Sequence, residues 1–91
     1  MNVSFDPGKD EWNVRERGLS LALASELDWA RARIDEDTRK DYGERRFRVL
    51  GFIGERLFAL VFTPRNGMLH VISLRKANLR EINRYAKTPQ A

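Results

Sequence analysis

The stretch "RFRVLGFIGERLFALVFTPRNGMLHVISL", residues 46–74, decides the fold of this chain. Its apolar side chains form three runs of strand length, and residues that favour tight turns separate the runs. Gly54-Glu55 lies between the first two runs and Asn66-Gly67 lies between the last two. Since Asn and Gly adopt the positive φ angles of a turn at little cost, a tight turn is expected at each place. The middle run, "LFALVF", is continuously apolar, as in a central strand covered on both sides. The pattern predicts a three-stranded antiparallel meander.

The segments before and after this stretch are expected to be largely helical. Asp6-Pro7 combines a helix-capping carboxylate with a proline at the first helical position, and Gly18 is suited to end that helix. The run "LALASELDWA", residues 21–30, repeats its apolar side chains at helical spacing. A last helix is expected to begin near Asn78, because Asn78 and Glu81 have the spacing of a capping box.

The expected fold class is α+β. In chain order we expect a short strand at residues 2–6, two helices, a three- or four-stranded antiparallel sheet and a C-terminal helix. The fourth strand would be an edge strand near residues 32–34. Leu79 and Ile82 are expected to pack the last helix down onto the sheet. The length is that of one domain, so residues 1–91 are assigned to a single domain.

Charge is distributed unevenly along the chain. Residues 1–44 carry 7 Lys/Arg and 11 Asp/Glu, a net charge of −4, whereas residues 45–91 carry 10 Lys/Arg and 2 Asp/Glu, a net charge of +8. Such asymmetry suggests a polyanionic partner for the basic half. The alternative is that the basic surface only keeps a small protein in solution.

The composition excludes several classes of site. The sequence has no cysteine, so it has no disulfide framework and no thiolate chemistry. With His70 as the only histidine, a zinc site would need carboxylates for its other ligands, so we expect no metal and no cofactor. The N-terminus lacks the apolar region of a signal peptide, and no apolar run is long enough to span a membrane. We therefore expect a cytoplasmic protein without a membrane partner.

The basic residues of the second half suit two chemical tasks. They can neutralise the phosphates of a nucleic acid, and they can stabilise the charge that develops on phosphorus during phosphoryl transfer. Because RNA carries its own nucleophile, the 2′-hydroxyl, a ribonuclease of this kind needs neither a metal ion nor a catalytic triad. The cations assigned to these tasks are Arg46, Arg48, Arg65, Arg75, Lys76, Arg80 and Arg84.

Arginine stays protonated, so proton transfer needs other groups. The candidates are His70, whose ordinary pKa suits a proton acceptor, Glu44 and Tyr85. Each has a structural alternative: His70 as a sheet residue, Glu44 as an ion-pair partner in a loop, and Tyr85 as the side chain that packs the last helix. Trp12 and Trp29 are interpreted as core residues rather than as platforms on which bases stack.

Four segments, in this order, resemble the BrnT toxins of bacterial type II toxin–antitoxin modules. The first is "FDPGKDEWNVRERGLS", where the family has W/F-D-x-x-K, an Asn, and then a basic pair and Gly. The second, "YGERRF", is similar to the family's G-E-x-R-F. The third, "FTPR", is similar to V-x-T-x-R, and the last, "ISLRKANLREINRY", to I-S-x-R-x-A followed by E-x-x-x-Y. These motifs fall on Gly43, Glu44, Arg46, Phe47, Thr63, Arg65, Ser73, Arg75, Ala77, Glu81 and Tyr85.

The resemblance implies a small RelE-like fold and a ribonuclease that halts translation. It implies a cognate BrnA-like antitoxin with a ribbon-helix-helix DNA-binding part. Toxin and antitoxin would form a hetero-oligomer that represses its own promoter, so operator DNA would be contacted only through the antitoxin. From the residue chemistry and the resemblance together, Arg46, Arg75, Glu44, His70 and Tyr85 are the predicted catalytic residues, and Arg17, Arg48, Arg65, Lys76, Arg80 and Arg84 are predicted to bind RNA.

One departure from the family pattern leaves two hypotheses open. The family often has Lys-His before the glycine that ends the first helix, whereas this chain has Glu16-Arg17. If that histidine shifts protons, this chain lacks it; if it only supplies positive charge, Arg17 substitutes for it. The first hypothesis is therefore an active ribonuclease, and the second is a non-catalytic nucleic-acid-binding or protein-interaction module with the same fold.

Overall fold

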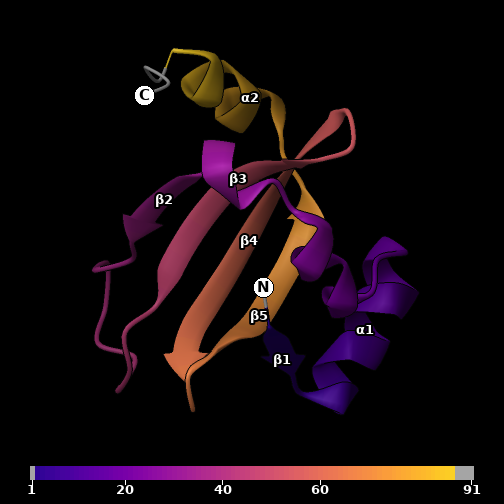
Figure 1. Ribbon diagram of the computed structural model, residues 1–91, viewed down its shortest axis with the longest axis vertical. Coiled ribbons are helices and arrows are strands. Elements are labelled where there is room, and N and C mark those ends of the chain that lie inside the picture. The colour runs from indigo at the N-terminus through magenta and orange to yellow at the C-terminus, as the bar shows by residue number, and fades with distance from the viewer. Residues whose placement is uncertain (1, 88–91) are drawn as a thin grey trace.

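The three apolar runs form the predicted meander in the computed structural model, which describes residues 2–87 (Figure 1). Strands β3 (Phe47–Ile53), β4 (Arg56–Arg65) and β5 (Met68–Lys76) pair antiparallel in sequence order. Gly54 and the Asn66-Gly67 pair adopt positive φ angles at the two turns, as predicted. β4 lies at the centre of the sheet, which explains its continuous apolar sequence.

The sheet has five strands in the order β1-β5-β4-β3-β2. The predicted edge strand is confirmed as β2 (Arg33–Glu36), antiparallel to β3. β1 (Val3–Phe5) pairs parallel with β5, so the expected three- or four-stranded antiparallel sheet is wrong in strand number and in the direction of one strand. A short strand's apolar pattern carries no information about which distant strand it joins, so the path of the whole chain decides its direction.

The first helix, α1 (Pro7–Arg17), has the predicted ends. The Asp6 carboxylate accepts a hydrogen bond from the Gly8 N–H (3.3 Å), and Gly18 ends the helix with φ 70°. The single helix expected at residues 21–30 is wrong. Two 3₁₀ helices, η1 (Leu21–Glu26) and η2 (Trp29–Arg31), occupy this segment, because the Asp28 N–H bonds to the Phe52 carbonyl oxygen of β3 (2.8 Å) instead of continuing a helix.

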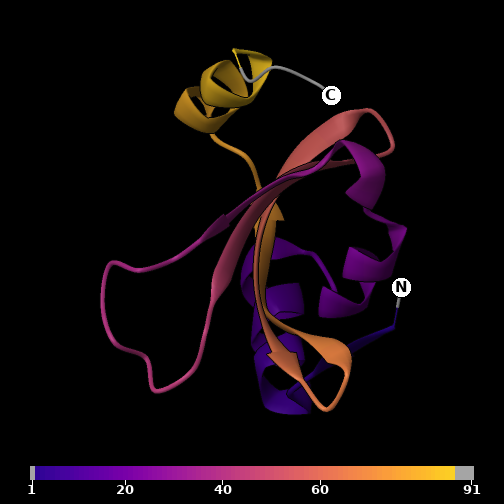
Figure 2. The same ribbon diagram turned by 60° about the vertical axis from the view of Figure 1, so that its left-hand side comes forward.

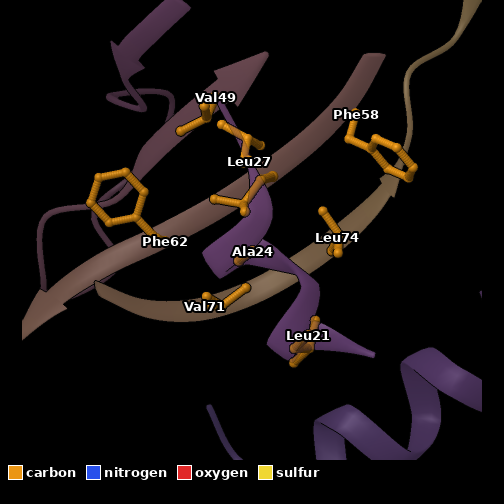
Figure 3. Packing of buried hydrophobic residues seen from close by; sticks show 9 residues of the cluster. Leu21, Ala24, Leu27, Val49, Phe58, Phe62, Val71 and Leu74 are labelled. Carbon is orange, nitrogen blue, oxygen red and sulfur yellow. The ribbon is translucent and has the colours of Figure 1, made fainter. Parts of the chain in front are cut away.

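The core lies between η1 and one face of the sheet (Figure 3). It consists of Leu21, Ala24, Leu27, Val49, Phe58, Leu60, Phe62, Val71 and Leu74. Trp29 packs against this cluster, edge-on to the ring of Phe62 with 5.9 Å between centroids, as expected of a core residue. The same expectation for Trp12 is wrong, because Trp12 is 45% exposed.

Asn13 explains why α1 lies beside β5 rather than flat on the core. Asn13 is buried, with 2% of the residue exposed. Its side-chain nitrogen donates hydrogen bonds to the carbonyl oxygens of Leu19 (2.8 Å) and Leu74 (2.9 Å). The helix therefore satisfies a backbone acceptor of β5 that lies beyond the short pairing with β1. This attachment leaves Trp12, one residue earlier on the helix, facing solvent in part.

The C-terminal helix α2 (Leu79–Ala86) lies on the opposite side of the sheet from α1 and η1 (Figure 2). The Asn78–Glu81 capping box is confirmed. Leu79 and Ile82 do not pack on the sheet, contrary to expectation, because they are 72% and 38% exposed. Tyr85 holds the helix instead: its ring packs edge-on to Phe52 at 5.4 Å, and its hydroxyl donates to the Arg31 carbonyl oxygen at 2.7 Å.

Candidate nucleic-acid interface

The face of the sheet that α1 and η1 leave uncovered is lined by alternate strand residues. In one row across the sheet, Arg48 of β3 lies opposite Val61 of β4, which lies opposite Ser73 of β5. In the next row, arginines stand at both ends, in the order Arg33, Leu50, Ala59, Arg75. The register of the strands therefore brings β2 and β5 arginines onto one surface, although they are far apart in the sequence.

This face forms a groove of about 610 Å³, which we call the basic groove. α2 and the connection between β2 and β3 both project on its side of the sheet (Figure 2). Six arginines line the groove against three carboxylates, so its net charge is positive: Arg33, Arg39, Arg48, Arg75, Arg80 and Arg84 face Asp35, Glu36 and Glu81. A concave surface with an excess of one charge concentrates the potential and attracts polyanions.

Arg75 is held in the basic groove by a two-pronged hydrogen bond to a carboxylate. Its two terminal nitrogens donate to the two carboxylate oxygens of Glu81 at 2.7 and 2.9 Å. This hydrogen-bonded pair lowers the pKa of Glu81 and raises that of Arg75, so both stay charged. Because 42% of the Arg75 side chain is exposed, the guanidinium is both fixed in place and accessible to a ligand.

Arg48 and Arg80 differ from Arg75 in having no ion pair. Both side chains are exposed and line the basic groove. Within residues 2–87 neither has a carboxylate partner. Neither guanidinium is bonded to a carboxylate, although Asp35 of β2 lies opposite Arg48, so both are available to contact phosphate.

A second group of predicted residues gathers around Glu44, outside the basic groove. One carboxylate oxygen of Glu44 accepts from Arg46 Nε (3.2 Å) and the other from Arg65 Nη2 (3.0 Å). The hydrogen bond from Arg65, supported by Arg46, keeps the pKa of Glu44 below its ordinary value. The Arg46 guanidinium also lies over the Tyr42 ring, 4.2 Å from its centroid.

His70 lies near this second group. Its Nδ1 atom is 2.9 Å from the Ser4 hydroxyl oxygen, across the β1–β5 pairing. Partial burial, together with the nearby charge of Arg65, holds the pKa of His70 below its ordinary value, so the imidazole is neutral at neutral pH and can accept a proton. On β4, Thr63 lies opposite His70 and Ala59 lies opposite Arg75, so four rows of the sheet, or about 13 Å, separate His70 from Arg75.

The predicted catalytic residues therefore occupy three places. Arg75 lies in the basic groove, whereas Glu44, Arg46 and His70 lie toward the other end of β5. Tyr85 belongs to α2, and its hydroxyl donates a hydrogen bond to the backbone carbonyl oxygen of Arg31. Of the predicted RNA-binding residues, the structure places three in the basic groove and three outside it: the first are Arg48, Arg80 and Arg84, and the others are Arg17, Arg65 and Lys76.

A sequence profile described as that of the ribonuclease toxin BrnT of type II toxin–antitoxin systems matches residues 5–81. This chain belongs to the BrnT family. The match runs from the last residue of β1 into α2, so in this BrnT-family chain it includes strands β2 to β5 and every residue that lines the basic groove except Arg84. Membership indicates a ribonuclease toxin, with RNA as the substrate and an antitoxin as the partner. No curated protein matches the sequence significantly.

The BrnT motif residues include residues that serve the fold, residues of the basic groove, and the group around Glu44 described above. Asn13 and Gly18 serve the fold, the first as the link between α1 and β5 and the second as the helix end. Ser73, Arg75 and Glu81 line the basic groove. Glu81 was missed as a site residue, because its capping-box spacing already accounted for it locally. Arg33 and Arg39 were also missed, since no local pattern places the β2 segment beside β5.

Residues 2–87 contain no group of three or more His, Asp or Glu side chains arranged to hold a metal ion. None of the helices in this range has the length and apolar character required to cross a membrane.

Proposed function

We propose that this BrnT-family chain is an endoribonuclease that cleaves RNA on the open face of its sheet without a metal ion. The basic groove is the observation that carries the proposal: six arginines converge on one concave surface, and two of them have no carboxylate partner among residues 2–87. Contacts of this kind hold the sugar-phosphate backbone independently of sequence. A sheet with α1 and η1 on one face and a concave second face bordered by α2 also fits the RelE-like fold.

The chemistry requires two proton transfers and stabilisation of charge on phosphorus. The 2′-hydroxyl oxygen attacks the adjacent phosphorus and transfers its proton to a base, and the bond from phosphorus to the 5′-oxygen breaks as that oxygen is protonated. The products are a 2′,3′-cyclic phosphate and a 5′-hydroxyl. A base must lie within hydrogen-bond reach of the proton that it accepts. We therefore assign the scissile phosphate to the Arg46 end, beside neutral His70 and Glu44, and flanking phosphates to Arg75 and the groove.

Purified protein in EDTA is expected to cut single-stranded RNA and to leave 2′,3′-cyclic phosphate ends, which mass spectrometry of the fragments identifies. The reason is that every charged group that we assign to the reaction belongs to the protein. The same RNA with 2′-O-methyl riboses is the matched control, because it lacks the nucleophile and should stay intact. Metal-independent cleavage would be refuted if EDTA removed the activity and a divalent cation restored it. Fragments with 3′-hydroxyl ends would also refute it.

A non-catalytic RNA-binding module is the second candidate function. Two observations favour this alternative. The carboxylate nearest to Arg75, that of Glu81, is hydrogen-bonded to Arg75. The chain also has Glu16-Arg17 where the family often has Lys-His. Under this alternative, RNA would bind without being cut, and binding would weaken steeply as salt is raised. Expression of the wild-type chain would then leave bacterial growth unchanged.

We also propose where the antitoxin binds. α2 exposes Leu79 and Ile82 beside Arg80 and Arg84, and these two arginines also line the basic groove. An apolar strip flanked by cations fits an acidic, amphipathic segment, here one from a BrnA-like ribbon-helix-helix antitoxin. Such a segment would extend over Arg75 and exclude RNA. The hetero-oligomer would contact operator DNA only through the antitoxin, and the toxin would act in the cytoplasm, where translation occurs.

Replacing both Leu79 and Ile82 by Asp is expected to weaken antitoxin binding at least about tenfold, because it removes apolar contact and adds charges that repel an acidic segment. Calorimetry with the ribbon-helix-helix protein encoded by the neighbouring gene measures this. Val14→Asp is the control, since Val14 is an equally exposed apolar residue of α1 (47%). If the control weakens binding and the α2 variant does not, the antitoxin occupies the other side of the molecule.

A further inference from the structure

Trp12 is a large aromatic residue that the core does not use. It lies on α1, and 45% of its surface is exposed. The Arg17 guanidinium lies over its ring, 5.0 Å from the centroid. Arg17 in turn donates to the Asn13 side-chain oxygen at 3.2 Å, so its position over the ring is fixed by the buried residue that attaches the helix to β5. The ring is therefore held in a defined orientation while remaining accessible to a ligand.

The exposed ring borders a separate hollow of about 500 Å³ between α1 and β5. Lys9 and Arg17 supply positive charge to its lining, Asp6 supplies one negative charge, and Ile72 supplies apolar surface. Ser73 lines both this hollow and the basic groove, so the two are contiguous on the protein surface. An RNA strand that leaves the groove over this edge of β5 would therefore reach an accessible aromatic ring.

We propose that this hollow binds one unpaired nucleobase of the RNA that lies in the basic groove, and that the base stacks on Trp12. The inference rests on the proposed function, since it presupposes RNA in the groove. Proteins recognise single-stranded RNA by stacking its bases on aromatic side chains while cations hold the adjacent phosphates. Trp12 supplies the stacking surface, and Lys9 and Arg17 supply the cations.

This assignment makes the substrate single-stranded at that nucleotide. A base in a duplex is stacked and paired, so entering the hollow would require that it leave the helix and lose its pairing and stacking. The basic groove by itself does not distinguish paired from unpaired RNA, because its arginines contact phosphates, which both forms carry. Trp12 is thus the residue that we expect to determine the preference for unpaired substrate, and Lys9 and Arg17 contribute affinity without that preference.

The test uses a short 2′-O-methyl oligonucleotide, which binds without being cut, and an abasic oligonucleotide with the same backbone. Trp12→Ala is expected to weaken binding of the complete oligonucleotide about 5- to 150-fold, the range found when a stacked base loses its aromatic partner. The same variant should bind the abasic backbone as wild type does. Trp12→Phe, which keeps a ring, should retain most of the affinity.

Tryptophan fluorescence gives an independent measurement on the unmodified fold. Binding of the complete oligonucleotide should quench the wild-type emission, and the quenching should be absent in Trp12→Phe, where only Trp29 remains. Suppose that Trp12→Ala and the wild type bind the complete oligonucleotide with equal affinity, whereas Arg48→Ala binds it more weakly. This result would overturn the stacking proposal and leave the proposed function intact. If the wild-type protein binds neither oligonucleotide, both the RNA assignment and the stacking proposal are wrong.

Discussion

Replacing Arg46 and Arg75 together by alanine should lower the rate of RNA cleavage at least about 100-fold and abolish growth arrest in an expressing bacterium. Removal of one preorganised donor to a developing oxyanion typically costs a factor of 10² to 10³. Arg46 belongs to the end of the face that holds His70 and Glu44, and Arg75 belongs to the basic groove, so the double variant affects both places. Initial cleavage rates and colony counts after induction measure the effect.

The two single variants then determine which arginine contacts the scissile phosphate. An arginine that acts in the transition state lowers kcat when it is removed, whereas one that only holds a flanking phosphate raises KM. We expect Arg46→Ala to lower kcat and Arg75→Ala mainly to raise KM. The reverse result would move the scissile phosphate into the basic groove, beside Glu81.

Arg56→Ala is the matched control for these variants. Arg56 is exposed at the start of β4, outside the basic groove, and the same residue change there should leave cleavage unchanged. Because Arg46 and Arg75 both bond to carboxylates, thermal unfolding of each variant must be recorded as well. If the double variant is folded and cleaves RNA at the wild-type rate, then neither arginine takes part in the reaction.

Asn13→Asp should lower the free energy of unfolding by about 3 kcal/mol, although the two side chains have almost the same shape. The amide nitrogen donates to two backbone carbonyls, and a carboxylate oxygen in its place would face both acceptors with no proton to offer. For a chain of this length the loss corresponds to a fall in Tm of about 10–20 °C. Urea denaturation followed by circular dichroism measures it.

Asn83→Asp is the control for this prediction, because Asn83 is exposed on α2. Its replacement should change the free energy of unfolding by less than about 0.5 kcal/mol. Asn13→Ala should fall between the two, since it removes the donor without adding a repelling acceptor, and the Arg17 contact to the Leu74 oxygen (3.4 Å) remains. Equal stability of the Asn13→Asp and Asn83→Asp variants would show that α1 is held to β5 by other contacts.

Part of the candidate site could be predicted from the sequence. The basic second half of the chain and the family motifs indicated Arg48, Arg75, Arg80 and Arg84, and all four line the basic groove. Whether they act on RNA stays a prediction. Four of the predicted catalytic residues were taken from motifs far apart in the sequence, and His70 was chosen for its ordinary pKa. Strand spacing puts about 13 Å between His70 and Arg75. This separation depends on the strand register and its bulge, which the sequence alone does not show.

Trp12 and Leu79 show why burial was harder to predict than secondary structure. Both are large apolar residues at helical positions, and both were expected to be buried. They are exposed because hydrogen bonds made by other residues, Asn13 for α1 and Tyr85 for α2, set the orientation of each helix. A hydrophobic pattern predicts which face of a helix is apolar, but not whether another element covers that face.

The sequence by itself determined the meander with its two turns, the ends of α1 and α2, and membership of the BrnT family. These features depend on residues within a few positions of one another, where turn chemistry, capping and strand alternation act directly. Only the tertiary structure decided the parallel pairing of β1, the 3₁₀ turns at residues 21–31, and the convergence of Arg33 and Arg75 on one face. Each of these depends on contacts between segments that lie far apart in the chain, and no local pattern encodes such contacts.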